Sequence, residues 1–160
     1  MKNTRAKHMS QAAMIAALYV ILTSFTNLLG LANGVIQIRF SEALTILPLY
    51  FPAAIPGVFI GCLISNLLTG CALWDIVFGS LATLIAAFIT SKMRKFKYLA
   101  TLPPVIANTL IIPPILKIVY AVPDAMWFIY LTVFIGEIIS CTILGTGLIT
   151  IIEKRFMHKA

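Results

Sequence analysis

Ten of the twelve Lys and Arg residues of this chain lie in three short clusters that are separated by long apolar stretches. The clusters are Lys2, Arg5 and Lys7; Lys92, Arg94, Lys95 and Lys97; and Lys154, Arg155 and Lys159. Basic residues collect in the cytoplasmic loops of membrane proteins, and about 20 consecutive apolar residues span a bilayer as a helix. The pattern therefore predicts a protein of the cell membrane that crosses it several times. The net charge of +7 then reflects orientation in lipid and does not indicate a nucleic-acid partner.

The composition excludes a water-soluble domain. Hydrophobic residues make up 61% of the chain and charged residues only 11%, whereas soluble domains contain about 25% charged residues. No Ser-, Gly- or charge-rich stretch is long enough to link two domains, so one domain over residues 1–160 is expected. The cysteines Cys62, Cys71 and Cys141 form no CxxC pair, and they predict neither a zinc site nor a disulfide framework.

The apolar stretches predict an all-α integral membrane protein with six transmembrane helices. The expected spans cover residues 9–28, 41–51, 54–68, 75–91, 98–119 and 125–152. The first is expected to remain as a helix and not to be cleaved as a secretory signal. Prolines break regular hydrogen bonding in the second and fifth spans, which is tolerated in lipid where the chain packs on protein or lines a cavity. Six crossings place both termini and all three basic clusters on the cytoplasmic side.

Small residues mark two faces for close helix packing. Ala12 with Ala16, and Ala13 with Ala17, form two overlapping small-xxx-small pairs in the first span. Gly57 and Gly61 have the GxxxG spacing in the third. Helices associate in lipid through such faces, because a smooth surface lets two backbones approach closely. The alanine face therefore predicts a helical neighbour.

Polar and ionisable residues gather in the outer half of the predicted bundle. An ionised group inside a membrane is costly, so such residues predict a functional site. Glu137 lies about a dozen residues into the sixth span, roughly 18 Å along the helix and near the midplane. The predicted substrate-binding residues of this outward-facing pocket are Arg39, Glu42, Asn66, Trp74, Asp75, Asn108 and Glu137.

Structural roles remain open for several of these residues. Arg39 and Glu42, three positions apart, could pair with each other on one helical face. Asp75 could cap the fourth helix, because an acid accepts hydrogen bonds from the free N–H groups there. Trp74 could belong to the aromatic belt at the membrane surface. The two asparagines could join neighbouring helices instead of contacting a ligand.

Catalysis is not predicted. His8 and His158 both lie in the terminal tails, so no histidine within the spans could act as a general base or metal ligand. The chain contains no HExxH, GxSxG or Walker motif. We therefore expect no catalytic residues, no metal and no cofactor. Because a P-loop is absent from the sequence, active transport would take its energy from a partner or an ion gradient.

One stretch of the chain has a more specific pattern. Residues 39–48 read Arg-Phe-Ser-Glu-Ala-Leu-Thr-Ile-Leu-Pro, and they are followed by Ile55-Pro56-Gly57, by Gly61-Cys62 up to Asn66, and by Asp-Ile-Val-Phe-Gly-Ser-Leu-Ala-Thr-Leu over residues 75–84. This run resembles the QueT family, the substrate-binding S components of energy-coupling factor (ECF) transporters that are assigned to import of queuosine precursors. The likeness is densest over residues 36–93, and beyond them it consists chiefly of hydropathy and Glu137.

The resemblance implies an ECF S-component-like bundle of six helices. Such a protein would capture queuine or a deazaguanine precursor outside the cell and would act with a membrane coupling subunit and two cytoplasmic ATPases. S components dock through an alanine-rich face on the first helix, which Ala12, Ala13, Ala16 and Ala17 match here. In that class the whole S component topples in the membrane to release its ligand inward.

The resemblance also implies roles for the candidate residues. Glu137 or Glu42 would read the guanine-like edge, because one carboxylate accepts two adjacent N–H donors. Asp75 or the other glutamate would meet the amine of an aminomethyl precursor. Arg39 and the asparagines would orient the carbonyl group, and Trp74 would stack on the heterocycle.

Two other functions stay open at this point, and a third is not supported. The chain could be an S component for another vitamin, or a proton-coupled secondary transporter that uses Glu137 as a relay. A lipid-modifying membrane enzyme lacks a catalytic constellation here. Asn33 and Gly34 also predict a mobile first loop, since glycine adopts conformations that other residues avoid.

Overall fold

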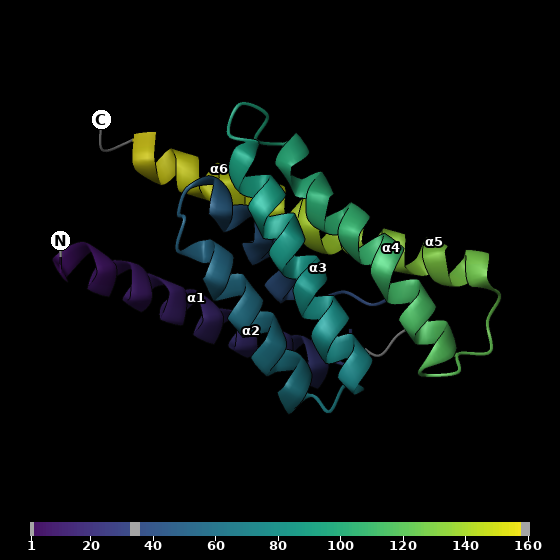
Figure 1. Cartoon of the computed structure of the whole chain (residues 1–160). Coiled ribbons are helices and arrows are strands. Elements are labelled where there is room, and N and C mark those ends of the chain that lie inside the picture. The colour runs from purple at the N-terminus through teal and green to yellow at the C-terminus, as the bar shows by residue number, and fades with distance from the viewer. Residues whose placement is uncertain (1, 33–35, 158–160) are drawn as a thin grey trace.

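The computed structural model describes residues 2–32 and 36–157, and these residues form helices joined by short loops (Figure 1). The elements are α1 (Lys2–Leu28), the 3-10 helix η1 (Phe40–Leu49), α2 (Ala54–Leu68), α3 (Leu73–Lys92), the 3-10 turn η2 (Leu99–Thr101), α4 (Leu102–Ile118), α5 (Met126–Glu137), the π-helical segment η3 (Ile138–Ile143) and α6 (Leu144–Met157). Asn33, Gly34, His158 and Lys159 lie outside the described residues.

Four helical stretches in the described part of the chain are long and apolar enough to cross a membrane. They are Thr4–Leu28, Leu73–Lys92, Leu99–Ile118 and Met126–Arg155. The last joins α5, η3 and α6 into one rod. The segments η1 and α2 are shorter, with 10 and 15 residues. The predicted all-α membrane bundle is confirmed, and each of the six expected stretches is helical.

The second stretch differs from an ordinary α-helix, because η1 is wound as a 3-10 helix over ten residues. Runs of this kind longer than three or four residues are uncommon and often accompany function or strain. Pro48 lies inside the segment and has no N–H to donate, so it favours a departure from α-helical bonding. Seven of the ten residues of η1 are buried, including Glu42. The segment therefore carries an acid into the interior of the bundle.

Close packing of α1 on α2 depends on two glycines. A Cβ atom at Gly61 would lie 2.6 Å from Cβ of Tyr19, and one at Gly57 would lie 3.0 Å from the carbonyl oxygen of Ala12. The predicted GxxxG contact therefore exists, and its partner is α1. Ala16 is buried in this contact, whereas Ala13 and Ala17 are exposed. Of the two alanine pairs, Ala12 and Ala16 therefore pack on α2, whereas Ala13 and Ala17 face outward.

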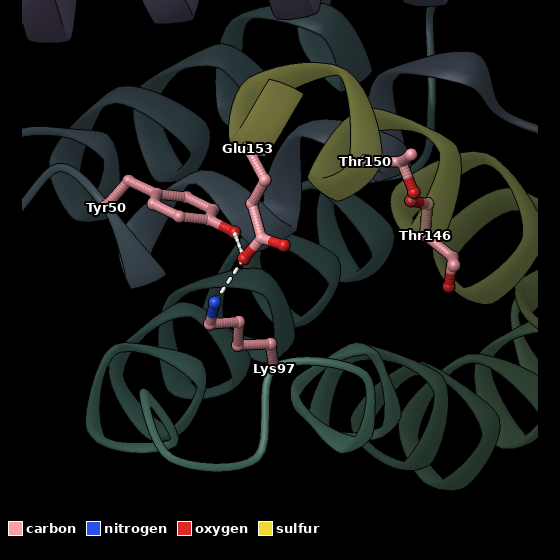
Figure 2. Close-up of polar contacts among 5 residues, drawn as sticks. All are labelled: Tyr50, Lys97, Thr146, Thr150 and Glu153. Atoms are coloured by element: carbon pink, nitrogen blue, oxygen red, sulfur yellow. Dashed lines mark hydrogen bonds and ion pairs between the residues drawn. The ribbon is translucent and has the colours of Figure 1, made fainter. Parts of the chain in front are cut away.

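The basic clusters lie at one end of the bundle, which we call the basic end. Figure 1 shows both chain ends and the loop between α3 and α4 toward the upper left, with the α2–α3 and α4–α5 connections at the lower right. Lys97 of the α3–α4 loop forms an ion pair with Glu153 of α6, and the Tyr50 hydroxyl donates to the same carboxylate at 3.3 Å (Figure 2). Ile46, Leu49, Ala100 and Ile149 form a buried apolar cluster from these same segments. The described residues of the three clusters therefore lie at one end of the bundle, and their placement on the cytoplasmic side stays a prediction.

Candidate binding site

Two adjoining hollows occupy the half of the bundle away from the basic end. The inner pocket is lined by Gln37, Arg39, Glu42, Cys62, Gly79, Thr83, Asn108, Ile112, Val133 and Glu137. The vestibule has a volume of about 600 Å³ and is lined by Thr23, Asn27, Ala32, Gln37, Arg39, Asn66, Thr69, Gly70, Cys71, Asp75, Ile112, Leu116, Tyr120 and Val122. Gln37, Arg39 and Ile112 line both, so they form the boundary between the two hollows.

The inner pocket is nearly closed in this conformation. Its volume is about 20 Å³, which is room for about one water molecule. A fused heterocycle needs several times that space. Occupation by such a ligand therefore requires the walls of the inner pocket to separate, whereas the vestibule is already large enough.

Glu42 contributes a buried carboxylate to the inner pocket. Its side chain extends from η1, and the residue is 2% exposed. The Tyr19 hydroxyl donates a hydrogen bond of 2.6 Å to Oε1, while the buried Oε2 atom has no hydrogen-bond partner. A buried acceptor without a partner is costly to folding. The free oxygen is consequently a place where a ligand donor would be stabilised.

Glu137 brings a second carboxylate to the same space. It is the last residue of α5, directly before the π-helical segment η3, and segments of this kind are frequent at functional sites. The Cys141 thiol donates to Glu137 Oε2 at 3.2 Å. One oxygen each of Glu42 and Glu137 and the Cys141 sulfur lie within 4.8 Å of one another. That spacing would admit a metal ion, but the Arg39 side chain lines the same pocket and adds a positive charge that opposes one.

Arg39 is positioned by a close contact between its loop and the α5–η3 junction. Its backbone N–H donates to Ser140 Oγ at 3.0 Å. A Cβ atom at Gly136 would lie only 2.2 Å from the carbonyl oxygen of Gln37, so only glycine leaves room for this loop. The one ion pair in the described part of the chain joins Lys97 and Glu153. Arg39 therefore does not pair with Glu42, and that structural alternative is wrong.

Asp75 lies in the vestibule. The helix α3 begins at Leu73, its N-cap is Ala72 and no side chain caps it, so Asp75 lies in the first turn and does not cap the helix. The residue is 5% exposed. The Tyr120 hydroxyl donates to Asp75 Oδ2 at 3.2 Å, and Oδ1 is buried without a hydrogen-bond partner. The acid thus offers a second free oxygen, separate from that of Glu42.

Tyr120 was not identified from the sequence. It follows α4, accepts a hydrogen bond of 2.9 Å from the Ala72 N–H and donates to Asp75. Burial, followed by the negative charge of Asp75, raises the pKa of Tyr120 to about 12, so the phenol keeps its proton at neutral pH. A single tyrosine in a loop carries no periodic signal, and only the folded chain shows that it closes one side of the vestibule. Gln37, also in a loop, and Thr83, an uncharged residue of α3, line the inner pocket and were not identified from the sequence either.

The two asparagines are buried in the hollows, and Trp74 is not. Asn66 of α2 lines the vestibule and donates to the Cys62 sulfur at 3.7 Å, while Asn108 of α4 lines the inner pocket. Trp74 is 59% exposed and stacks on Phe78, with ring centroids 5.6 Å apart. It lines neither hollow. Six of the seven predicted residues therefore meet at the two hollows, and the geometry does not support stacking of Trp74 on a ligand held there.

Helices long enough to cross a membrane, with buried carboxylate oxygens that lack a hydrogen-bond partner within and below a vestibule, are typical of a transport protein for a small polar solute. Comparison with known proteins gives the same class. The chain matches the model of the QueT transporter family over residues 9–154, and it belongs to this family of transporters.

A curated relative also matches part of the chain. It is the queuosine precursor transporter QueT of Lactococcus lactis subsp. cremoris (strain MG1363), which is 40% identical over 86 residues. The matched region covers 53% of this chain and 50% of the relative, so the likeness spans about half of each protein. No solved structure matches the chain.

Proposed function

We propose that this protein is the substrate-binding component of an importer for queuosine precursors, with queuine or a deazaguanine as its ligand. The observation that carries the proposal is the inner pocket, where Glu42 and Glu137 lie together beside Arg39 without forming an ion pair with it. Family membership and the name of the relative support the choice of solute.

The chemistry of the pocket suits this ligand class. A guanine-like edge presents adjacent N–H donors, and a carboxylate accepts two of them at once. Glu42 has one buried oxygen free for such a bond. If both glutamates are ionised, the two acids and Arg39 leave one net negative charge, which would suit the cationic amine of an aminomethyl precursor. Arg39 and Asn108 would donate to the carbonyl group of the base.

The proposed direction of transport follows from the two ends of the bundle. Positive residues favour the cytoplasm, which would place the basic end and both termini inside and the vestibule outside. The solute would enter the vestibule first, near Asp75 and Tyr120. The inner pocket would then widen to admit it, because its present volume of about 20 Å³ is too small.

Binding of candidate solutes to the purified protein tests the proposal. A ligand that binds the folded state alone raises its stability by about 2.7 kcal/mol at 100 times its dissociation constant. We expect queuine or an aminomethyl deazaguanine to raise the thermal unfolding midpoint in detergent, and riboflavin, thiamine and biotin to leave it unchanged. A shift with one of these vitamins alone would assign the protein to another solute.

Import would also need partners, which we propose are an ECF coupling subunit in the membrane and two cytoplasmic ATPases. An apolar groove of about 510 Å³ runs beside α1 and is lined by His8, Met9, Ala12, Ala13, Ala16, Pro52, Ala53, Pro56 and Ile60. Ala13, which lines the groove, and Ala17, one turn further along α1, are both exposed. This face would receive a helix of the coupling subunit, since small side chains allow close approach.

Enlarging the exposed alanine pair should separate docking from ligand binding. The double variant Ala13→Leu, Ala17→Leu is expected to reduce co-purification with the coupling subunit at least tenfold, because overpacking costs about 1–3 kcal/mol. Its affinity for the ligand should stay at the wild-type value. The matched control is Leu18→Phe, at an exposed position about 100° further around the same helix, and it should retain the partner. Equal loss in both variants would argue against a specific docking face.

A proton-coupled secondary transporter is the second candidate, because the Glu137 carboxylate lies inside an apolar rod. Uptake into proteoliposomes that contain this chain alone distinguishes the two functions. Uptake that collapses when the proton gradient is removed would favour the relay. Uptake that needs the coupling subunit, the ATPases and ATP would favour the importer.

A further inference from the structure

A further hollow lies at the basic end, and we call it the basic groove. It has a volume of about 610 Å³ and lies between the η1–α2 turn and the end of α3. Its lining residues are Pro48, Pro52, Ile55, Phe88, Ser91, Lys92, Arg94, Lys95 and Phe96. None of them lines the inner pocket or the vestibule, so the groove is separate from the proposed solute site.

The charge in this groove is uncompensated. Lys92, Arg94 and Lys95 are exposed, and no Asp or Glu is among the lining residues. The ion pair found among the described residues uses Lys97 and Glu153, which are not part of the lining. The Lys92 ammonium group lies 5.3 Å from the centre of the Phe88 ring, so this cation is directed back over the groove wall. Three cations at one hollow favour an anionic occupant.

The same groove has an apolar wall. Phe88 and Phe96 are exposed large side chains, and Pro48, Pro52 and Ile55 lie near them. Phe88 precedes Lys92 by one turn of α3, a candidate spanning helix, so its Cα atom lies about 6 Å further from the basic end along the helix than that of Lys92. The apolar and cationic parts therefore follow each other along the membrane normal.

We propose that the basic groove binds an anionic phospholipid. Its headgroup phosphate would contact Lys92, Arg94 and Lys95, and the start of an acyl chain would lie along Phe88. Basic pockets at the membrane surface, between or beside transmembrane helices, bind such headgroups. In a phospholipid the charged headgroup lies above the apolar acyl chain, and the cations and the exposed Phe88 ring of the groove follow the same order. An acidic protein segment would be held by the cations alone and would have no use for the ring. The proposal does not depend on which solute the protein carries.

The test is native mass spectrometry of the full chain in a neutral detergent. We expect bound phosphatidylglycerol at concentrations where phosphatidylcholine is absent from the complex. Each basic residue near an anionic lipid surface contributes about fivefold in binding. The triple variant Lys92→Gln, Arg94→Gln, Lys95→Gln should therefore bind phosphatidylglycerol on the order of 100-fold more weakly. Arg94→Gln alone should bind about fivefold more weakly, and this single variant serves if the triple variant does not fold.

The matched control removes three exposed cations of the other clusters, Arg5→Gln, Lys7→Gln and Lys154→Gln. It should keep phosphatidylglycerol binding within a few fold of the wild type. Equal weakening in the control and the groove variant, or no weakening in the groove variant, overturns the proposal. Equal binding of soluble glycerophosphoglycerol would mean a phosphate site without lipid selectivity. Loss of coupling-subunit binding with unchanged lipid binding would identify the groove as a protein interface instead.

Discussion

Replacing Glu137 or Glu42 with Gln is expected to lower the affinity for a deazaguanine ligand by about 100-fold. Both carboxylates line the inner pocket, and each would accept charge-assisted hydrogen bonds that an amide cannot reproduce, because its NH₂ group opposes the ligand's own N–H donors. Isothermal titration of the purified variants in detergent measures the effect. The thermal midpoint without ligand should show that both variants remain folded.

The control for this experiment is Glu153→Gln at the basic end. This change removes the ion pair with Lys97, far from either hollow, and leaves an amide oxygen that can still accept from Tyr50. It should leave ligand affinity at the wild-type value. Wild-type affinity in the Glu42 and Glu137 variants as well would mean that the inner pocket does not hold the ligand.

Gly136→Ala is expected to destabilise the protein by about 3 kcal/mol and to abolish detectable ligand binding. The new Cβ atom would lie 2.2 Å from the carbonyl oxygen of Gln37, and a backbone atom cannot turn aside as a flexible side chain can. The loop would have to move away from α5, and Arg39, two residues after Gln37, would move with it and lose the hydrogen bond from its N–H to Ser140. Thermal unfolding and ligand titration measure the two consequences.

Gly147→Ala is the control for this substitution. A Cβ atom at Gly147 meets nothing within 4 Å, and the residue lies in α6. Alanine should be neutral there or should stabilise the helix by up to about 1 kcal/mol. A Gly136→Ala protein that melts and binds like Gly147→Ala would contradict the close approach of the loop to α5.

Much of the architecture was predictable from the cost of burying charge in lipid. This cost makes the spanning helices long and apolar, and it confines Lys and Arg to the segments between them. The same argument identified Glu42, Asp75 and Glu137, which all line the hollows. Trp74 was less predictable. Neighbouring positions on a helix point about 100° apart, so Trp74 faces away from the direction that Asp75 takes.

Two further features depend on tertiary contacts that the sequence does not state. The prolines indicated an irregular second stretch, but its winding as a 3-10 helix follows from packing inside the bundle. The overlapping alanine pairs could not show which pair α2 covers. Gly57 and Gly61 decide this, because their missing side chains admit the backbone of Ala12 and Ala16.

The π-helical segment Ile138–Ile143 has a consequence for the whole α5–α6 rod. A π-type turn holds one more residue than an α-turn, which offsets everything after it by about 100° around the axis. The two halves of this rod are therefore out of phase, and a single helical wheel drawn through both would assign wrong faces. This offset lets Glu137 point toward Glu42 while Glu153, sixteen positions later, meets Tyr50 and Lys97 at the other end. Deleting one residue of the segment would restore a regular α-helix without turning the two glutamates relative to each other, whereas an unbroken α-helix of the present length would turn one of them by about 100° from its present face.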